Sequence, residues 1–418
     1  MCGICGIISK TSLTFDHAQQ VNLMNQALIH RGPDDTGIYV ADNFAFAMRR
    51  LSIIDVNSGN QPLYNEDGSI VLVANGEIYN YCELIESLKI RNHHFNTKSD
   101  CETILHLYEE YGENCVHYLR GMFAFALWDS KKNKILLVRD RMGEKPLYIY
   151  ENNDIIIFSS EMKSLLNSGL IPFDINPTAV DLFFHYLYIP EPKTAIKNVR
   201  KLPAGNIFCI DLLTWKQKEI RYWSIESAPP LFGNPVEIIR DELDSVSDLI
   251  IRSDVPVGIA LSGGLDSSAI AALTTEKYPE KMHGFSIGYS GRPFCDERED
   301  AQKFADYLDI YFHDVELKTD NLVSLFPDLI AYSDDPISDI SSYGYYSVAK
   351  LAHENGISVI LQGHGSDELF WGYPWVKEAV FETNRKRQLL KGKWATLFQY
   401  LSINKPDNYS LNTLAYWM

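Results

Sequence analysis

The chain of 418 residues is long enough for two or three domains, and 46% hydrophobic with 22% charged residues is the composition of a globular protein. A formal net charge of -17 argues against nucleic acid or an anionic membrane surface as a main partner, and no stretch approaches the 18 apolar residues of a membrane span. Seven scattered cysteines, with no secretory signal at the start, predict reduced thiols and a cytoplasmic location.

The first feature in chain order is Cys2, directly after Met1. If Met1 is removed, Cys2 carries a thiol and a free α-amine, whose ordinary pKa of about 7.7–8.0 suits a base at neutral pH. One residue then supplies both nucleophile and general base. The alternative interpretation is an early residue of a buried strand. A redox or zinc interpretation of Cys2-x-x-Cys5 is weaker, because no second cysteine pair or histidine cluster accompanies it.

Residues 1–212 are expected to form one β-rich layered domain. Short apolar runs at 70–74, 123–128 and 134–138 predict core strands, and helical patterns lie between such runs at 15–30, 81–89 and 100–111. Residues 213–235 predict a linker, because the segment from Trp223 to Pro235 is rich in proline and polar residues.

From residue 236 the pattern changes to alternating helices and strands. Helices are expected at 236–252, 267–278, 297–308 and 343–355, and strands at 255–261, 282–287, 311–317 and 358–361. This alternation predicts a parallel sheet covered on both faces, in a nucleotide-binding domain that spans 236–418.

A glycine turn, SGGLDSS at 262–268, follows the buried strand 255–261. Its glycines let the backbone approach a ligand, and the next helix presents free N–H groups and a positive dipole end. The turn therefore predicts a pyrophosphate site, although it is not a Walker A loop, whose lysine is missing. Asp266 inside this anion site is expected to hold Mg²⁺, to cap the helix, or both.

A second glycine-rich turn, QGHGSDE at 362–368, follows the strand 358–361. Open α/β sheets bind ligands at the carboxyl ends of their strands, so this turn is expected beside the first. Asp334 and Asp335 could add carboxylates to the same site; otherwise they belong to a surface turn.

Taken together, these strings resemble the glutamine-hydrolysing asparagine synthetases, in which a class II glutamine amidotransferase precedes an ATP pyrophosphatase-type synthetase domain. The resemblance covers nearly all of residues 1–376. It implies an N-terminal layered αββα domain of the Ntn-hydrolase type and a C-terminal α/β domain with a parallel sheet. It rests on MCGI at 1–4, RGPDD at 31–35, RRLSIID at 49–55, NGEIYN at 75–80, SDCE at 99–102, RDRMGEKPLY at 139–148, SSEMKSL at 159–165, SGGLDSS at 262–268 and GSDELF at 365–370.

The resemblance implies roles for the glutaminase site by position. Cys2 is the nucleophile that attacks the side-chain amide of glutamine, and the Asn75 side chain with the Gly76 backbone N–H forms the oxyanion hole. The residues that hold the α-carboxylate and α-ammonium of glutamine are Arg50, Glu77 and Asp100.

The resemblance also implies a nucleotide site in the second domain, with ATP and Mg²⁺ as cofactors. The residues placed on ATP are Leu261, Ser262, Gly263, Gly264, Asp266, Ser267, Ile287, Gln362 and Gly363, and those placed on Mg²⁺ are Asp266 and Asp367.

The implied reaction is asparagine synthesis. Ammonia released at Cys2 passes through an internal tunnel to an adenylated aspartate, and the products are asparagine, AMP and pyrophosphate. The expected partners are small molecules, namely glutamine, ATP and aspartate or another carboxylate, and the resemblance is compatible with a homodimer.

Two departures from the family pattern leave the acceptor open. His364 stands where the family usually has an acidic residue near the reacting carboxylate, and the chain ends at Met418, before an Arg-x-Pro-Phe-Leu-Asp string typical of the family. The chain is therefore expected to be a fragment or an incomplete synthetase. The alternatives are an amidotransferase for another carboxylate, such as a sugar acid or secondary metabolite, and a glutaminase whose second domain binds nucleotide without synthesis.

Overall fold

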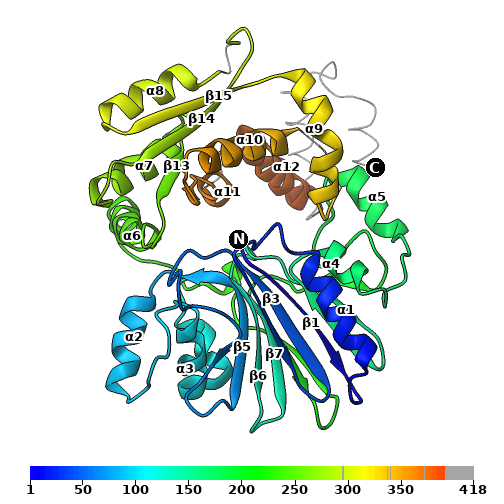
Figure 1. Cartoon of the computed structure of the whole chain (residues 1–418). Helices are drawn as coiled ribbons and strands as arrows, with labels where there is room; N and C mark the ends of the chain where they lie inside the picture. The colour runs from blue at the N-terminus through cyan, green and yellow to red at the C-terminus, as the bar shows by residue number, and fades with distance from the viewer. Residues whose placement is uncertain (294–295, 337, 339, 371, 391–418) are drawn as a thin grey trace.

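The chain forms two units, one below the other in Figure 1, and the N-terminus lies on the side of the lower unit that faces the upper one. The computed structural model describes residues 1–293, 296–336, 338, 340–370 and 372–390.

Two antiparallel sheets make up the lower unit. The strands of the first sheet, in spatial order, are β10 (Val199–Lys201), β8 (Tyr148–Glu151), β9 (Ile155–Ser159), β1 (Gly3–Ser9), β3 (Phe44–Arg50) and β2 (Asp35–Val40). Those of the second are β12 (Gln217–Arg221), β11 (Asn206–Asp211), β7 (Lys134–Arg139), β6 (Gly121–Asp129), β5 (Ile70–Ile78) and β4 (Leu63–Tyr64).

Helices cover the outer face of each sheet (Figure 1). The first sheet is covered by α1 (Phe15–Gln26) and α4 (Met162–Asn167), and the second by α2 (Tyr81–Ile90) and α3 (Glu102–Tyr111). Successive side chains of β1 point to opposite faces of its sheet and so contribute to two hydrophobic cores. Ile4 and Ile8 face the other sheet, while Cys5 and Ile7 pack under the helices. The layered αββα arrangement expected for this half is thereby confirmed.

The segment expected as a linker contributes a strand to the lower unit. β12 lies inside 213–235 and pairs with β11 from Asn206↔Arg221 to Ile210↔Gln217, so the second sheet extends nine residues past the expected boundary at 212. Its residues alternate little in hydrophobicity because β12 is a mostly exposed edge strand. The helix α5 (Pro177–Tyr186) was also not anticipated.

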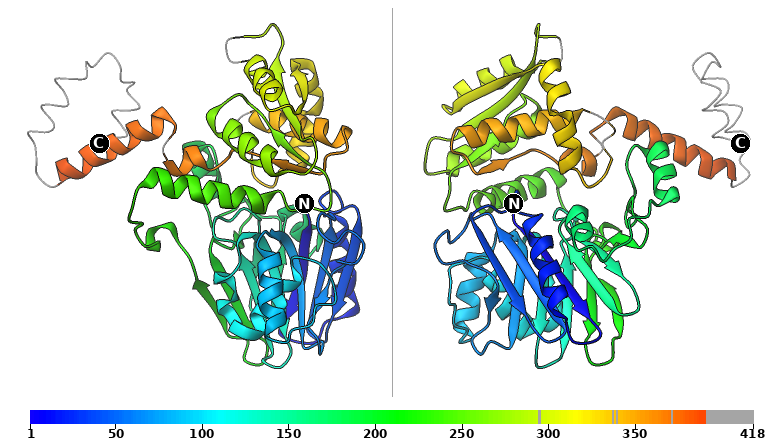
Figure 2. Two further views of the ribbon diagram at one scale, coloured as in Figure 1. Left: turned by 90° about the vertical axis from the view of Figure 1, so that its left-hand side faces the viewer. Right: turned by 45° about the vertical axis from the view of Figure 1, so that its right-hand side comes forward.

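The upper unit contains a parallel sheet of four strands, as expected from the alternating pattern. Its spatial order is β15 (Tyr311–Leu317), β14 (His283–Tyr289), β13 (Val257–Ala260) and β16 (Val359–Leu361). One face packs on α7 (Leu265–Lys277) and α8 (Arg298–Tyr307), and the other on α10 (Ser341–Glu354). The remaining helices are α6 (Pro235–Ile250), α9 (Thr319–Tyr332), α11 (Ser366–Phe370) and α12 (Pro374–Leu390), the last of which extends away from both units (Figure 2). Residues 391–418 of the expected second domain lie outside the described part.

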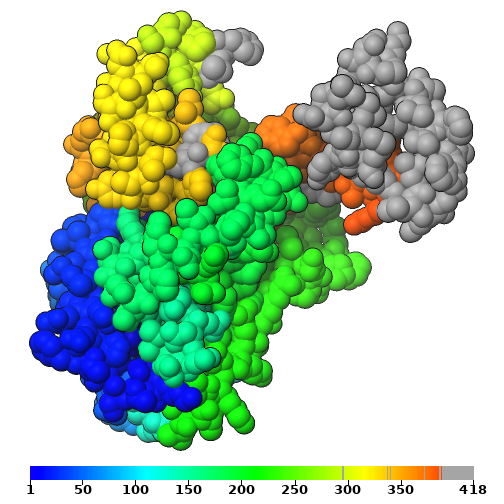
Figure 3. All heavy atoms as spheres, turned by 90° about the vertical axis from the view of Figure 1, so that its right-hand side faces the viewer, coloured from blue at the N-terminus to red at the C-terminus, as the bar shows by residue number. Residues whose placement is uncertain are grey.

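Ionic contacts join the two units. Arg252, after α6, binds both carboxylate oxygens of Glu83 at 2.8 and 2.6 Å and the carbonyl of Tyr79 at 2.9 Å. On another face α9 rests directly on the lower unit, where the ring of Tyr332 lies 5.3 Å from that of His30 (Figure 3).

None of the described helices has both the length and the apolar character needed to cross a membrane.

Candidate active sites

Cys2 lies at the start of β1, beside the end of β3. Gly3 pairs with Arg49, so Cys2 comes opposite Arg50. Its Sγ accepts a hydrogen bond from the backbone N–H of Leu51 at 3.4 Å, and its carbonyl accepts one from Arg31 Nε at 2.9 Å. Cys2 borders the core between the sheets, whereas Cys5 packs in the helix-covered core on the other face of β1, so the two thiols do not face one site.

The amine and the thiol at this end of the chain are both shifted by burial. Burial lowers the pKa of the Met1 amine to about 6, and the positive charges of Arg31 and Lys145 act in the same direction. Burial raises the pKa of the Cys2 thiol, while the Leu51 N–H and the charges of the amine and Arg50 oppose that change. At neutral pH a buried amine here is a neutral base beside a protonated thiol, which is the state that base-assisted attack needs.

The end of β5 carries a buried amide donor beside a glycine. Asn75 is 1% exposed, and its Nδ2 has no hydrogen-bond partner among the described residues. Leaving a buried N–H unpaired costs about 1–3 kcal/mol, so such a donor is typically kept for a ligand. At Gly76 a Cβ would come 2.5 Å from the Met122 carbonyl, so no side chain fits there.

Two carboxyl groups lie near this donor. Asp100 is buried, and its Oδ2 accepts the N–H of Ile78 at 2.7 Å. Burial raises the pKa of Asp100. Burial, reinforced by the Asp100 charge, raises the pKa of Glu77 to about 8. Two carboxyl groups that resist ionisation together favour a cation between them, and the α-ammonium of an amino acid is one.

Arg50 has a structural role that the sequence did not indicate. Its side chain is buried, and its terminal nitrogens donate to the carbonyls of Ile54 at 2.9 Å and Asp55 at 2.7 Å and to Asn60 Oδ1 at 3.1 Å. The guanidinium thus organises the loop after β3. The predicted contact with the α-carboxylate of glutamine would add to these bonds.

We expect the KM for glutamine to fall about fivefold between pH 7 and 8, because the ionised fraction of a carboxyl with a pKa near 8 rises by that factor. Only ionised Glu77 can pair with the α-ammonium of glutamine, so affinity improves as pH rises through the pKa of about 8. Steady-state glutaminase kinetics from pH 6 to 9 measure the dependence of this KM on pH. Glu77→Gln should raise KM and remove its dependence on pH in this window, while the exposed Glu86→Gln on α2 keeps the wild-type profile. A wild-type KM that is constant over the window would contradict this role of Glu77.

Two further residues, Arg31 and Lys145, lie at this site although no role was predicted for them. Arg31, in RGPDD, bridges the Cys2 carbonyl and Glu161, which its Nη1 meets at 2.9 Å. Lys145, in RDRMGEKPLY, is buried with its Nζ 3.1 Å from Met1 Sδ. The order of these strings along the chain gave no sign that they meet at the N-terminus.

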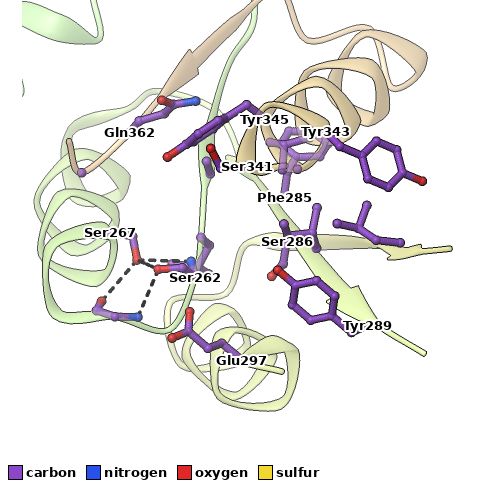
Figure 4. Close-up of a pocket in the computed structure, with 18 of the residues that line it drawn as sticks. Ser262, Ser267, Phe285, Ser286, Tyr289, Glu297, Ser341, Tyr343, Tyr345 and Gln362 are labelled. Carbon is purple, nitrogen blue, oxygen red and sulfur yellow. Dashed lines mark hydrogen bonds between the residues drawn. The ribbon is translucent and has the colours of Figure 1, made fainter. Parts of the chain in front are cut away.

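The second candidate site is a cavity of about 710 Å³ in the upper unit, at the carboxyl ends of β13, β14 and β16 (Figure 4). The structure brings together there every residue predicted for ATP or Mg²⁺ except Gly263, which does not line the cavity. The predicted residues in its wall are Leu261, Ser262, Gly264, Asp266, Ser267, Ile287, Gln362, Gly363 and Asp367.

The turn after β13 is held by its own hydroxyl groups. Ser267 Oγ accepts the N–H of Ser262 at 3.2 Å and lies 3.0 Å from Ser262 Oγ, which accepts the N–H of Gly264 at 3.3 Å (Figure 4). Gly263 has φ +75°, a conformation that favours glycine. A Cβ on Gly363 would lie 2.8 Å from the Ser267 nitrogen, so the two glycine turns pack backbone to backbone.

The cavity wall carries more acid than base. Asp266, Glu297 and Asp367 line it, with Lys318 as its one lysine, and neither Asp266 nor Asp367 pairs with a basic side chain among the described residues. These free carboxylates fit a divalent cation, which would have to accompany any polyphosphate bound in so acidic a site.

His364 lines the cavity, and its Nε2 lies 2.9 Å from the hydroxyl of Tyr345. Asp334 and Asp335 do not contribute to this site. Asp335 pairs with Lys201 at 2.5 Å, and Asp334 Oδ1 accepts the N–H of Lys163 at 3.3 Å, so both face the lower unit. The alternative prediction of a surface turn is also not met, because both residues are half-buried where the chain after α9 packs against the other unit.

A layered N-terminal unit with Cys2 at its edge, followed by a parallel sheet with a glycine turn, defines a two-domain amidotransferase. Residues 1–223 match the glutamine amidotransferase domain family, and residues 239–413 match the asparagine synthase family. The chain is a member of the glutamine-hydrolysing asparagine synthetase family, and it is an enzyme of that family.

Three relatives illustrate the similarity. The chain is 36% identical over 387 residues to asparagine synthetase [glutamine-hydrolyzing] 1 of Bacillus subtilis, covering 91% of this chain and 60% of that protein. It is 36% identical over 398 residues to the putative asparagine synthetase [glutamine-hydrolyzing] 2 of Methanocaldococcus jannaschii, covering 89% and 76%. It is also 32% identical over 409 residues to amidase chry2 of Gibberella zeae, covering 89% and 59%. The chain thus spans only about 60% of the length of the first of these relatives.

Proposed function

We propose that the protein hydrolyses glutamine at Cys2 and uses the ammonia, with ATP, to convert aspartate into asparagine. Glutamine and water give glutamate and ammonia. Aspartate and ATP give an aspartyl adenylate and pyrophosphate, and ammonia then displaces AMP from the adenylate. The observation that carries the proposal is buried Asn75, whose Nδ2 has no partner in the described part of the chain, together with the glycine-turn cavity of the second domain.

The proposed glutaminase step follows from the groups around Cys2. The α-amine, once Met1 is removed, takes the thiol proton as sulfur attacks the amide carbon of glutamine. The developing oxyanion accepts hydrogen bonds from Asn75 Nδ2 and the Gly76 N–H, a contribution of about 3 kcal/mol for each donor. The α-ammonium of glutamine pairs with Glu77 and Asp100, and the α-carboxylate with Arg50. The amine returns its proton to the leaving ammonia, which leaves a thioester between Cys2 and the glutamyl group. Water, deprotonated by the same amine, then attacks the thioester carbon, and glutamate departs as the Cys2 thiol recovers its proton.

In the proposed nucleotide site, backbone N–H groups and hydroxyls bind the phosphates, with little contribution from basic side chains. N–H groups at the start of α7 and the hydroxyls of Ser262 and Ser267 suit phosphate oxygens. Asp266 and Asp367 would hold Mg²⁺, which offsets the phosphate charge in the acidic cavity. Adenylation is needed because a carboxylate has no leaving group of its own.

The acceptor is the least constrained part of the proposal. His364 in the cavity wall offers an imidazole where the family usually has an acidic residue, and one relative is named an amidase rather than a synthetase. These two observations favour, as a second candidate, an amidotransferase for a different carboxylate. A glutaminase whose second domain binds nucleotide without synthesis is the third.

A pyrophosphate-release assay with a carboxylate panel, ATP and glutamine distinguishes these candidates. We expect aspartate to give the highest kcat/KM, with AMP, pyrophosphate and asparagine formed in equal amounts, because the chain is 36% identical to relatives named asparagine synthetases. A sugar acid or another acid preferred over aspartate would replace the first candidate by the second. Glutamine hydrolysis with no nucleotide turnover for any acid would leave only the third.

A further inference from the structure

Four side chains outside both catalytic sites converge on one point at the edge of the lower unit. They are Glu66 from the turn between β4 and β5, His93 from the loop after α2, and His106 and Glu109 from α3. One ligand atom from each lies within 4.8 Å of the other three. We propose that Glu66, His93, His106 and Glu109 form a Zn²⁺ site that ties these three segments together.

The separations between the facing nitrogen and oxygen atoms are close to those around a tetrahedral ion. His93 Nδ1 lies 3.3 Å from Glu66 Oε1 and 3.5 Å from Glu109 Oε2, whereas His106 Nδ1 lies 3.5 Å from Glu66 Oε2 and 2.9 Å from Glu109 Oε2. Zinc bonds of about 2.0–2.2 Å in a tetrahedron place neighbouring ligands about 3.3–3.6 Å apart, so an ion would widen the His106–Glu109 pair and select one of the two Glu66 oxygens. Two imidazole nitrogens and two carboxylate oxygens are also a ligand set that zinc accepts, and the two negative charges match its charge.

Both histidines turn the same nitrogen, Nδ1, toward the common point, and their other nitrogens face carboxylates. His93 Nε2 lies 3.1 Å from Glu110, within hydrogen-bond distance, whereas His106 Nε2 lies 3.7 Å from Glu102 and makes no hydrogen bond among the described residues. A hydrogen-bonded carboxylate behind a histidine, as at His93, fixes the ring and raises its basicity, as in many zinc sites. His106 is 0% exposed, so its ring cannot turn away into solvent.

The two carboxylates are held in place as well. Glu109 Oε1 accepts a hydrogen bond from Asn65 Nδ2 at 2.8 Å, which leaves Oε2 for the ion. Glu66 Oε1 accepts the backbone N–H of His94 at 3.0 Å. Both glutamates are exposed, so an ion can reach the site from solvent.

The cluster is not visible in the sequence because the two histidines are 13 residues apart and Glu66 comes from the turn between β4 and β5. Only the spacing of His106 and Glu109, one turn apart on α3, gave a local sign of the site. Because α3 begins next to Asp100, the ion would also stiffen the segment that supports the predicted glutamine pocket.

The test is metal binding by the whole chain, measured without regard to activity. The apoprotein is titrated with Co²⁺, whose visible spectrum reports tetrahedral coordination, and then with Zn²⁺ in competition. We expect one Co²⁺ per chain with intense bands, displacement by Zn²⁺, and a higher Tm with Zn²⁺ than with EDTA. Weak octahedral bands, no saturable binding, or no change in Tm would overturn the proposal.

Adjacent histidines provide the matched control. His93→Ala should weaken Co²⁺ binding at least 100-fold and remove the tetrahedral bands, whereas the exposed neighbour His94→Ala should keep both. Glu66→Gln is a milder second variant, since Glu66 lies in an exposed turn and its replacement preserves shape; it should also lose the tetrahedral spectrum. Equal metal binding by wild type, His93→Ala and Glu66→Gln would place the metal elsewhere and overturn the site.

Discussion

Replacing Cys2 with alanine is expected to lower glutamine hydrolysis more than about 10³-fold while ammonia-dependent synthesis continues. The thiol is the only group proposed to form a bond to glutamine. The nucleotide cavity, in contrast, is built entirely from residues after 259. Glutaminase assays and pyrophosphate release with either glutamine or ammonium chloride separate the two activities.

Cys82→Ala is the matched control for this experiment, because Cys82 is an exposed free thiol on α2. It should keep both activities. Mass measurement of the purified wild type should show that Met1 has been removed, since the mechanism requires the α-amine of Cys2. Retained glutaminase activity in Cys2→Ala, or equal loss of glutamine- and ammonia-dependent synthesis, would contradict the assignment of two separate sites.

The second large effect is expected at Asn75. Asn75→Ala should lower kcat for glutamine hydrolysis about 10²–10³-fold, because it removes one oxyanion donor. Its KM should change little, since the contact strengthens only in the transition state. The thermal stability should be nearly unchanged, because Nδ2 makes no hydrogen bond within the described protein and its removal relieves an unpaired buried donor.

Asn65→Ala provides the opposite case. Asn65 is also buried, but its side chain accepts the N–H of Ile70 at 2.9 Å and donates to Glu109 at 2.8 Å. Its replacement should lower Tm and leave kcat near the wild-type value. If Asn75→Ala instead lost stability in proportion to activity, its amide would be a structural group and not an oxyanion donor.

Much of the fold was accessible from local patterns. The helices at 81–89 and 100–111 appear as α2 and α3 with shifts of one or two residues, and the strand at 311–317 appears unchanged as β15. These elements have strong apolar periodicity, which depends on residues near in sequence. β12 and α5 escaped notice because both are largely exposed, and the helix face or strand edge that each presents is fixed by its neighbours in space.

The candidate sites divide in the same way. The turn at 262–268 could be identified from its residues, because glycine and serine at a strand end already predict a turn able to hold phosphate. The contacts of Arg31 and Lys145 at the N-terminus could not, since residues about 30 and 140 positions away meet there only through sheet pairing. The use of Arg50 to hold the loop after β3 likewise depends on where that loop folds.

By itself the sequence determined the alternation of strands and helices in the second domain and the plan of two domains, and it predicted roles for Cys2 and the glycine turn, because short-range pattern and residue type indicate each. Only the tertiary structure decided that Asn75 keeps a buried donor unpaired within the described residues, that Asp334 and Asp335 face the other domain, and that Glu66, His93, His106 and Glu109 share one point. Burial, pairing and convergence are properties of chain segments brought together from a distance, and they arise only when the sheets and helices pack.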